Sequence, residues 1–128
     1  MSYTHDRMIE AASFDAVDAR VRAALAERGF GVLTEIDVKA TLKAKIDVDL
    51  DDYRILGACN PSMAHKAIGI EPRVGAMLPC NVILRAVEGG VEISAVDPVI
   101  SMKAIDNAAL HQIATEVRAM LVEAVDAA

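Results

Sequence analysis

Residues 79–98 read PCNVILRAVEGGVEISAVDP, and this segment settles which kind of sheet the chain can form. Apolar residues recur at every second position on both sides of Gly89-Gly90, a pattern typical of two strands joined by a tight turn. A hairpin pairs its strands antiparallel, so the segment argues against an all-parallel, doubly wound sheet.

Strands and helices alternate on the N-terminal side of this hairpin. Alternation at period two predicts strands at residues 3–10 and 30–36, and an apolar run predicts a further strand at residues 53–59. Helices are predicted after Ser13, Asp37 and Asn60, which are residue types suited to a helix N-cap. The connection around Pro72 is predicted to be irregular. The predicted fold class is α+β, with helices packed on a largely antiparallel sheet of about five strands.

The C-terminal segment predicts a long helix. An apolar residue recurs every three or four positions from Leu110 to Val125. Asp106 is the predicted N-cap, with Ile105 and Leu110 packing across it as a hydrophobic staple. Because no repeat or low-complexity linker interrupts the pattern, residues 1–128 are predicted to form a single domain.

Size and charge narrow the classes of partner. The chain has 128 residues and a formal net charge of -6, which repels a nucleic-acid backbone. Its longest uncharged stretch, residues 74–84, is too short to cross a membrane. The N-terminus shows no secretory signal, and two cysteines in an intracellular chain are expected to be free thiols. The sequence therefore predicts a cytoplasmic protein with no nucleic-acid or membrane partner.

Familiar cofactor motifs do not fit. The Gly-Phe-Gly run at residues 29–31 follows a helix and leads into a strand, with Thr34 where a dinucleotide loop needs its third glycine. The acidic loop at residues 47–52 has Asp52 where a calcium loop needs glycine and Ala58 where it needs glutamate. The sequence excludes these two motifs, and it leaves open whether the protein binds any other cofactor.

Two Cys-Asn dipeptides, each beside a proline, stand at predicted strand ends and are expected to converge on one site. Together with one nearby histidine they form the candidate ligand-binding set: Cys59, Asn60, Pro61, His65, Pro79, Cys80 and Asn81. The spacing of its cysteines and histidine is not that of a metal motif, so no metal site is predicted.

The two cysteines are also the candidate catalytic residues. Cys59 directly precedes a predicted helix, where unpaired N–H groups and the helix dipole favour a thiolate. In the alternative interpretation, Cys59 and Cys80 are small buried residues that share the alternation of their apolar neighbours.

Four segments resemble, in order, the family catalogued as domain of unknown function 302. They are RGFGVLTEIDV at 28–38, YRILGACNP at 53–61, EP at 71–72 and LPCNV at 78–82. The resemblance implies a curved antiparallel sheet with helices packed on it, similar to the TATA-binding-protein type of arrangement, and it implies a homodimer. It implies no activity, and it carries the matched cysteines, asparagines and prolines over as motif positions only.

Three functional hypotheses follow. The first is a homodimer that binds a small molecule at the two dipeptides, with binding dependent on Asn60 and Asn81. The second is a thiol-dependent redox enzyme or sensor, with Cys59 as the nucleophile and Cys80 as its resolving partner. The third is a structural interaction module without a ligand. Whether the chain is an enzyme is left open by the sequence.

Overall fold

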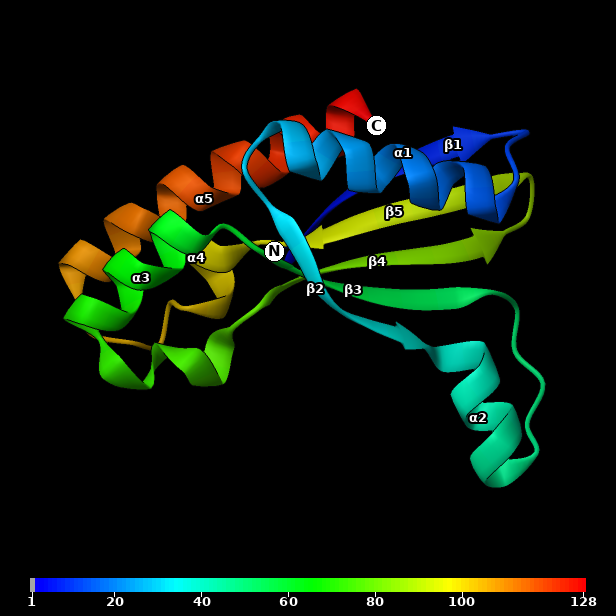
Figure 1. The fold of residues 1–128 in the computed structure, drawn as a ribbon, viewed down its shortest axis with the longest axis horizontal. Coiled ribbons are helices and arrows are strands. Elements are labelled where there is room, and N and C mark those ends of the chain that lie inside the picture. The colour runs from blue at the N-terminus through cyan, green and yellow to red at the C-terminus, as the bar shows by residue number, and fades with distance from the viewer. Residues whose placement is uncertain (1) are drawn as a thin grey trace.

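Five strands form one open antiparallel sheet in the computed structural model, which describes residues 2–128 (Figure 1). The strands are β1 Thr4–Glu10, β2 Gly31–Asp37, β3 Tyr53–Cys59, β4 Cys80–Val87 and β5 Gly90–Val96. Their order across the sheet is β1-β5-β4-β3-β2, and every neighbouring pair is antiparallel. The predicted α+β class and the predicted hairpin are confirmed. The likeness to the TATA-binding-protein type of arrangement stays a prediction.

Helices connect these strands and follow the last one. They are α1 Phe14–Glu27, α2 Val38–Ile46, α3 Pro61–Ile70, the 3-10 helix η1 Pro72–Met77, α4 Pro98–Ser101 and α5 Ala108–Ala127. The three predicted N-caps are confirmed: the side chains of Ser13, Asp37 and Asn60 each accept a hydrogen bond from the backbone N–H three residues on.

The start of α5 differs from the prediction. The N-cap is Asn107, whose Oδ1 accepts a hydrogen bond from the Leu110 N–H at 3.1 Å, so the prediction of Asp106 was wrong. Asp and Asn cap about equally well, and the choice is made by a distant contact. The Asn107 amide also donates to the Ile70 carbonyl oxygen at 3.0 Å, which ties the cap to the end of α3. Ile105 and Leu110 still pack in one apolar cluster.

Two short helices were not predicted. The six-residue η1 and the four-residue α4 each begin at a proline. Proline fits the first turn of a helix because it needs no N–H donor there. Segments this short complete no more than two turns, so they leave no apolar period for a sequence pattern to detect.

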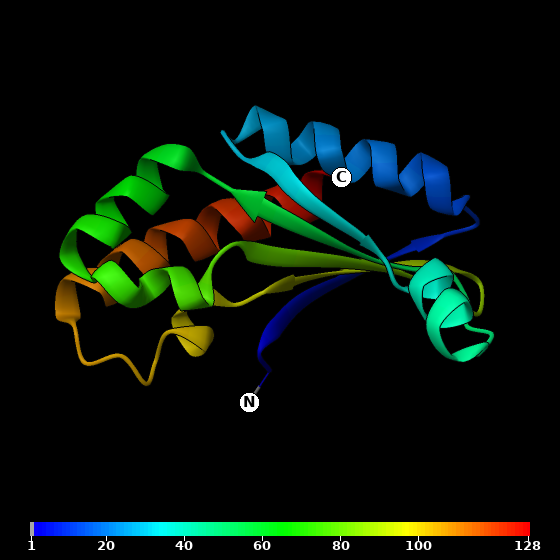
Figure 2. The same cartoon turned by 60° about the horizontal axis from the view of Figure 1, so that its bottom comes forward.

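One face of the sheet carries the main core. Strand alternation points Leu56, Val82, Leu84 and Ile93 toward α1 and α5, and all four side chains are fully buried. The two helices lie across this face in Figures 1 and 2. A smaller cluster lies beyond the sheet, among α3, η1, α4 and the first half of α5, here called the helical lobe.

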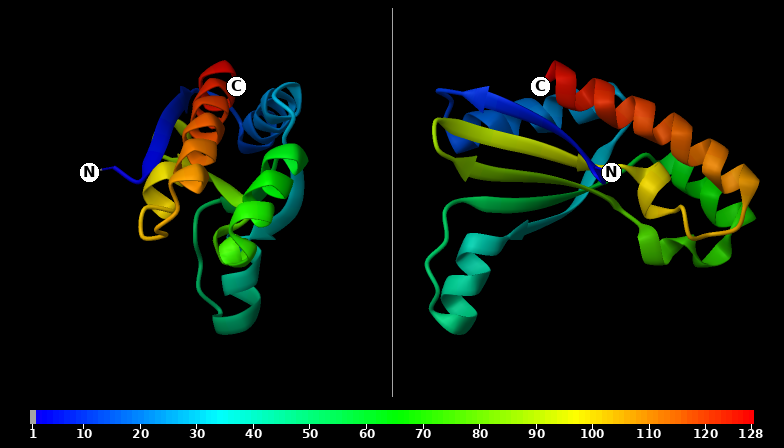
Figure 3. Two further views of the ribbon diagram at one scale, coloured as in Figure 1. Left: turned by 90° about the vertical axis from the view of Figure 1, so that its left-hand side faces the viewer. Right: turned by 180° about the vertical axis from the view of Figure 1, so that it is seen from behind.

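The α2 helix projects from the molecule past the ends of β2 and β3, on the side remote from the helical lobe (Figures 1 and 3). None of its residues is buried. Within residues 2–128, no helix is both long enough and apolar enough to cross a membrane.

Candidate functional site

An apolar cavity lies where β3 and β4 meet the helical lobe. Ala58 at the end of β3 pairs with Cys80 at the start of β4, which brings the two Cys-Asn segments together. The cavity encloses about 30 Å³, room for about one small chemical group. Its lining consists of Phe30, Ala58, Cys59, Asn60, Met63, Ala64, Ala67, Leu78, Pro79, Cys80, Pro98, Met102, Leu110, Ile113, Ala114 and Val117.

The cavity lies between the two apolar clusters of the protein. Cys80 and Val117 belong to the main core, whereas Ala67 and Met102 belong to the cluster of the helical lobe. Well-packed interiors leave few voids of this size. The gap therefore marks the line along which the two clusters meet without fully interdigitating.

Four of the seven predicted site residues line this cavity, namely Cys59, Asn60, Pro79 and Cys80. The other three, Pro61, His65 and Asn81, are exposed and are not part of the lining. Asn81 follows the buried Cys80 along β4, so strand alternation turns its side chain to the opposite face of the sheet.

Asn60 holds the end of the site in place. Its Oδ1 accepts the hydrogen bond that caps α3, from the Met63 N–H at 3.3 Å. The side-chain NH₂ is then the part of Asn60 left to meet a ligand. That group lies against the turn after α1, because a Cβ on Gly29 would be 3.2 Å from Asn60 Nδ2. Gly29 also has a φ of +82°, which favours glycine.

The two thiols have different surroundings. Both cysteines are free, and Cys59 is half-buried. Cys80 is only 7% exposed. Burial raises the pKa of the Cys80 thiol to about 11, and the nearby charge of Cys59 acts in the same direction. Cys80 is therefore a neutral thiol at neutral pH, which disfavours a role as a thiolate.

Metal binding gains no support from side-chain positions. Across residues 2–128, no group of three His, Cys, Asp or Glu side chains is placed to hold a metal ion.

Sequence reasoning missed most of the lining. Most of the missed residues are apolar side chains of α3, α4 and α5, and their helical spacing is the same whether they fill a core or line a cavity. No local signal separates those two outcomes. The space depends on how the helical lobe packs against the sheet, which is a tertiary property.

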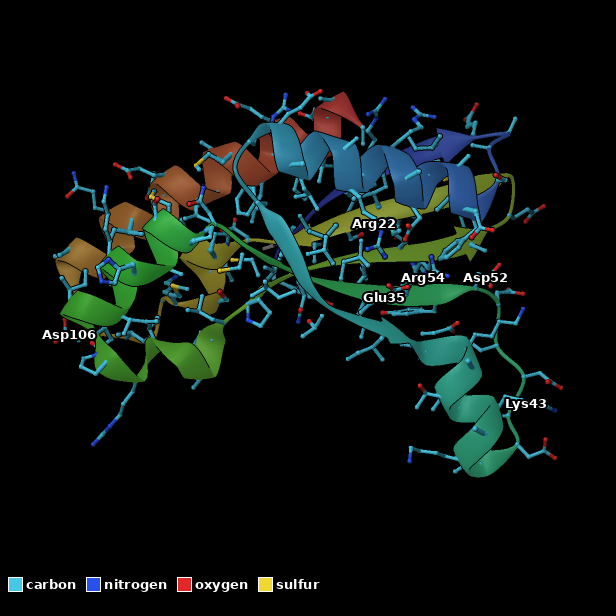
Figure 4. The ribbon with its side chains drawn as sticks, in the orientation of Figure 1. Arg22, Glu35, Lys43, Asp52, Arg54 and Asp106 are labelled. Atoms are coloured by element: carbon cyan, nitrogen blue, oxygen red, sulfur yellow. The ribbon has the colours of Figure 1, made fainter. Side chains whose placement is uncertain are left out.

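A second cluster of chemically active side chains lies between α1 and the β2–β3 edge, and Figure 4 labels three of its members, Arg22, Glu35 and Arg54. Asp18 pairs with Arg22 at 2.7 Å and with Arg54 at 2.9 Å, and Arg22 reaches Glu35 at 2.9 Å. Burial alone would raise the pKa of Asp18, but hydrogen bonds from both arginines hold it below its usual value. Opposite charges pair throughout the cluster, which fastens α1 to the sheet.

The comparisons with known proteins identify the family. The sequence profile described as "Domain of unknown function DUF302" matches residues 6–128. The chain belongs to the DUF302 family. The resemblance seen in its four sequence segments is therefore confirmed, and the matched region includes the whole cavity.

A solved DUF302 structure has the same fold. The crystal structure of an uncharacterized conserved DUF302 protein from Bacillus stearothermophilus superposes with a TM-score of 0.92, covering 98% of each chain at 24% sequence identity. At this identity the likeness shows the fold alone. No protein of curated function matches the chain. The DUF302 description names no activity, so function has to be argued from the site.

Proposed function

We propose that this DUF302 protein is a homodimer whose subunits each bind a small apolar molecule, or the apolar end of a larger one, in the cavity between the Cys-Asn segments. The observation that carries the proposal is convergence. Two segments separated in sequence and residues from three helices line one apolar cavity, with the Asn60 amide among its few polar groups.

The cavity has to widen to admit a ligand. At about 30 Å³ it is far smaller than the roughly 300–1,000 Å³ of typical ligand pockets. The wall formed by α3 is the one that moves most easily, because Ala67 is its only buried residue. Met63 and Met102 also line the space, and flexible methionine side chains adapt to ligands of different shape.

The ligand carries a hydrogen-bond acceptor next to its apolar part. Since the cap of α3 occupies the Asn60 Oδ1, the side-chain NH₂ is left to donate to a carbonyl or hydroxyl oxygen. Asn81 lies on the other face of the sheet, so binding depends on Asn60 and not on Asn81.

Methionine-methyl NMR tests the proposal directly. Titration with 2-pentanone, an apolar probe with one carbonyl, is expected to shift the Met63 and Met102 methyl signals. The exposed Met8 and Met77 are internal controls whose signals stay in place. If Met63 and Met102 do not shift up to the solubility limit of the probe, the cavity is not a binding site.

Two pairs of variants locate the site. Asn60→Asp keeps an oxygen to cap α3 but removes the donor, so it is expected to weaken probe binding, while Asn81→Asp leaves binding unchanged. Ala64→Leu fills the cavity and blocks the probe, whereas Ala23→Leu on the exposed side of α1 has no effect. Equal effects of Asn60→Asp and Asn81→Asp would contradict the proposed role of Asn60.

Thiol chemistry is less well supported than ligand binding. A redox pair needs Cys80 to react with Cys59, and the raised pKa of Cys80 keeps it protonated.

The homodimer is supported by apolar side chains left exposed outside the ligand site, including Ile36, Ile46 and Leu50. Native mass spectrometry of protein purified from its own cells tests the homodimer and the bound ligand at once, since it reports subunit number and any retained small molecule.

A further inference from the structure

We propose that two copies of this chain join by packing the arm of each copy against the uncovered sheet face of the other. The arm is residues 38–52, which comprise α2 and the loop that follows it. The uncovered face is the side of the sheet opposite α1 and α5. This inference takes the homodimer from the proposed function and names its interface, and it does not depend on ligand binding.

The arm has little of the packing that normally stabilises a short helix, since only Val38, Thr41 and Leu42 of α2 are half-buried. Isolated helices of fewer than about 12–15 residues are marginal in water, and α2 has nine residues and buries none of them. Its Lys43 pairs with Asp47 at 2.8 Å and with Asp49 at 3.1 Å. Such exposed ion pairs add little to stability because water screens them. The helix therefore needs a covering surface from outside its own subunit.

Apolar side chains on the arm indicate what kind of surface covers it. Ile46 is 63% exposed, and Val48 and Leu50 in the following loop are exposed as well. Large aliphatic side chains gathered on a projecting segment are typical of a protein interface.

The same chain carries a matching apolar surface. Antiparallel register places Ile36 opposite Ile55, and Ile55 opposite Ile83, so three isoleucines form a row across β2, β3 and β4. Met8 is exposed on the same face, at β1. Among residues 2–128 no helix lies across this face, as Figure 2 shows.

A second copy is the partner that satisfies both surfaces. The arm extends outward and does not fold back over its own sheet (Figure 3). A two-fold axis lets each arm meet the other sheet, so the contact forms twice. A five-stranded face about 24 Å wide and 23 Å long covers about 550 Å². Two such faces and two arms approach the roughly 1,200–2,000 Å² buried in stable dimers.

The charge of the α2 helix supports the same pairing. The α2 helix carries Lys39, Lys43 and Lys45 and no acidic residue. The uncovered face carries three acidic residues against one arginine: Asp6, Glu10 and Glu92, with Arg85 paired to Glu92. The arm as a whole carries four aspartates, Asp47, Asp49, Asp51 and Asp52, against these three lysines, so only the helix is basic where the sheet is acidic.

Analytical ultracentrifugation over a concentration series tests the interface. The wild-type chain is expected to sediment as a species of twice 13.6 kDa. Ile46→Glu on the arm and Met8→Lys on the sheet are each expected to raise the dissociation constant at least about tenfold, because each substitution acts twice in the dimer. Ile68→Glu on α3, an isoleucine 47% exposed, is the matched control and leaves the dimer intact.

Hydrogen exchange of the α2 amides adds a second readout. These amides are expected to be protected in the wild-type dimer, and to lose protection on dilution and in Met8→Lys. Three results overturn the inference: a monomeric wild type, a Met8→Lys variant as dimeric as wild type, or an Ile68→Glu variant that dissociates like Ile46→Glu. Each variant lies at an exposed or projecting position, and circular dichroism checks that it remains folded.

The ligand proposal and the dimer proposal fail separately. The Ile46→Glu monomer is expected to show the same Met63 and Met102 methyl shifts with 2-pentanone as wild type. Loss of the dimer with retained shifts supports the interface named here. Retained shifts in a wild type that never dimerises overturn this inference alone, and absent shifts in an intact dimer overturn only the ligand site.

Discussion

Gly57 lies in β3 where neighbouring side chains leave no room for a Cβ. A methyl group there would be 2.7 Å from Pro79 Cγ and would also meet Thr34 Oγ1. Gly57→Ala is expected to lower the free energy of unfolding by about 1–3 kcal/mol, because Pro79 and Thr34 must shift. Gly31→Ala, in the paired strand with nothing within 4 Å, is the control and is expected to change stability by less than about 0.5 kcal/mol. Urea denaturation measures both, and equal losses would contradict the close contact with Pro79.

Cys80 is expected to resist alkylation that Cys59 undergoes. In the Cys59→Ser variant, iodoacetamide is expected to leave Cys80 unmodified at pH 8, because the thiol is buried and its pKa is raised to about 11 from an ordinary 9.0. The unfolded chain ionises first, so the stability associated with this group is present below pH 9 and is lost as the pH rises from about 9 to about 11. Mass spectrometry measures the labelling, with urea-unfolded protein as the positive control. Rapid labelling of the folded variant at pH 8 would contradict the burial of Cys80.

At the scale of elements, substitutions at the start of α5 distinguish Asn107 from Asp106 as its N-cap. Asn107→Ala is expected to cost about 1 kcal/mol of stability, since the Leu110 N–H loses its acceptor and the Ile70 carbonyl loses its donor. Asp106→Ala is expected to cost less than about 0.5 kcal/mol, because Asp106 is exposed and outside the cap. Thermal melts compare the two variants. A larger loss for Asp106→Ala would restore the sequence-based assignment.

The attachment of α1 to the sheet is expected to depend on pH. The pKa of Asp18 is lowered by its arginine partners, so its contribution to stability is present above the ordinary value of 3.8 and is lost as the pH falls through the folded-state pKa. Asp18→Asn is expected to destabilise the protein by about 1–2 kcal/mol at pH 7 and by less at low pH. Asp15→Asn on the same helix is the control. A loss for Asp18→Asn that is constant with pH would show that shape, not charge, matters at this position.

At the scale of the whole molecule, two apolar clusters of unequal size stabilise different parts of the protein. The main core joins the sheet to α1 and α5, whereas the helical lobe has a far smaller cluster. Native-state hydrogen exchange is expected to show α3 and η1 opening at lower free energy than β3, β4 and β5. One common opening free energy for the lobe and the sheet would contradict this division and would remove the physical basis for widening the cavity at α3.

Local sequence patterns predicted much of the fold. Alternation around Gly89-Gly90 identified the antiparallel hairpin, and Ser13, Asp37 and Asn60 marked helix starts, because strand alternation and helix capping depend on residues close together in the chain. The two Cys-Asn segments pointed to one locus because each stands at a strand end. Asn107, by contrast, is chosen as a cap through its bond to Ile70, which lies in a different helix.

By itself, then, the sequence determined the α+β class, the antiparallel hairpin, the family and the convergence of Cys59 with Cys80. Only the tertiary structure decided that Asn81 and His65 lie outside the cavity, that apolar residues of α3, α4 and α5 line it, and that α2 projects uncovered. The physical reason is the distance along the chain over which each interaction acts. Backbone periodicity and capping act within a few residues, whereas a cavity and an exposed arm depend on how distant elements pack.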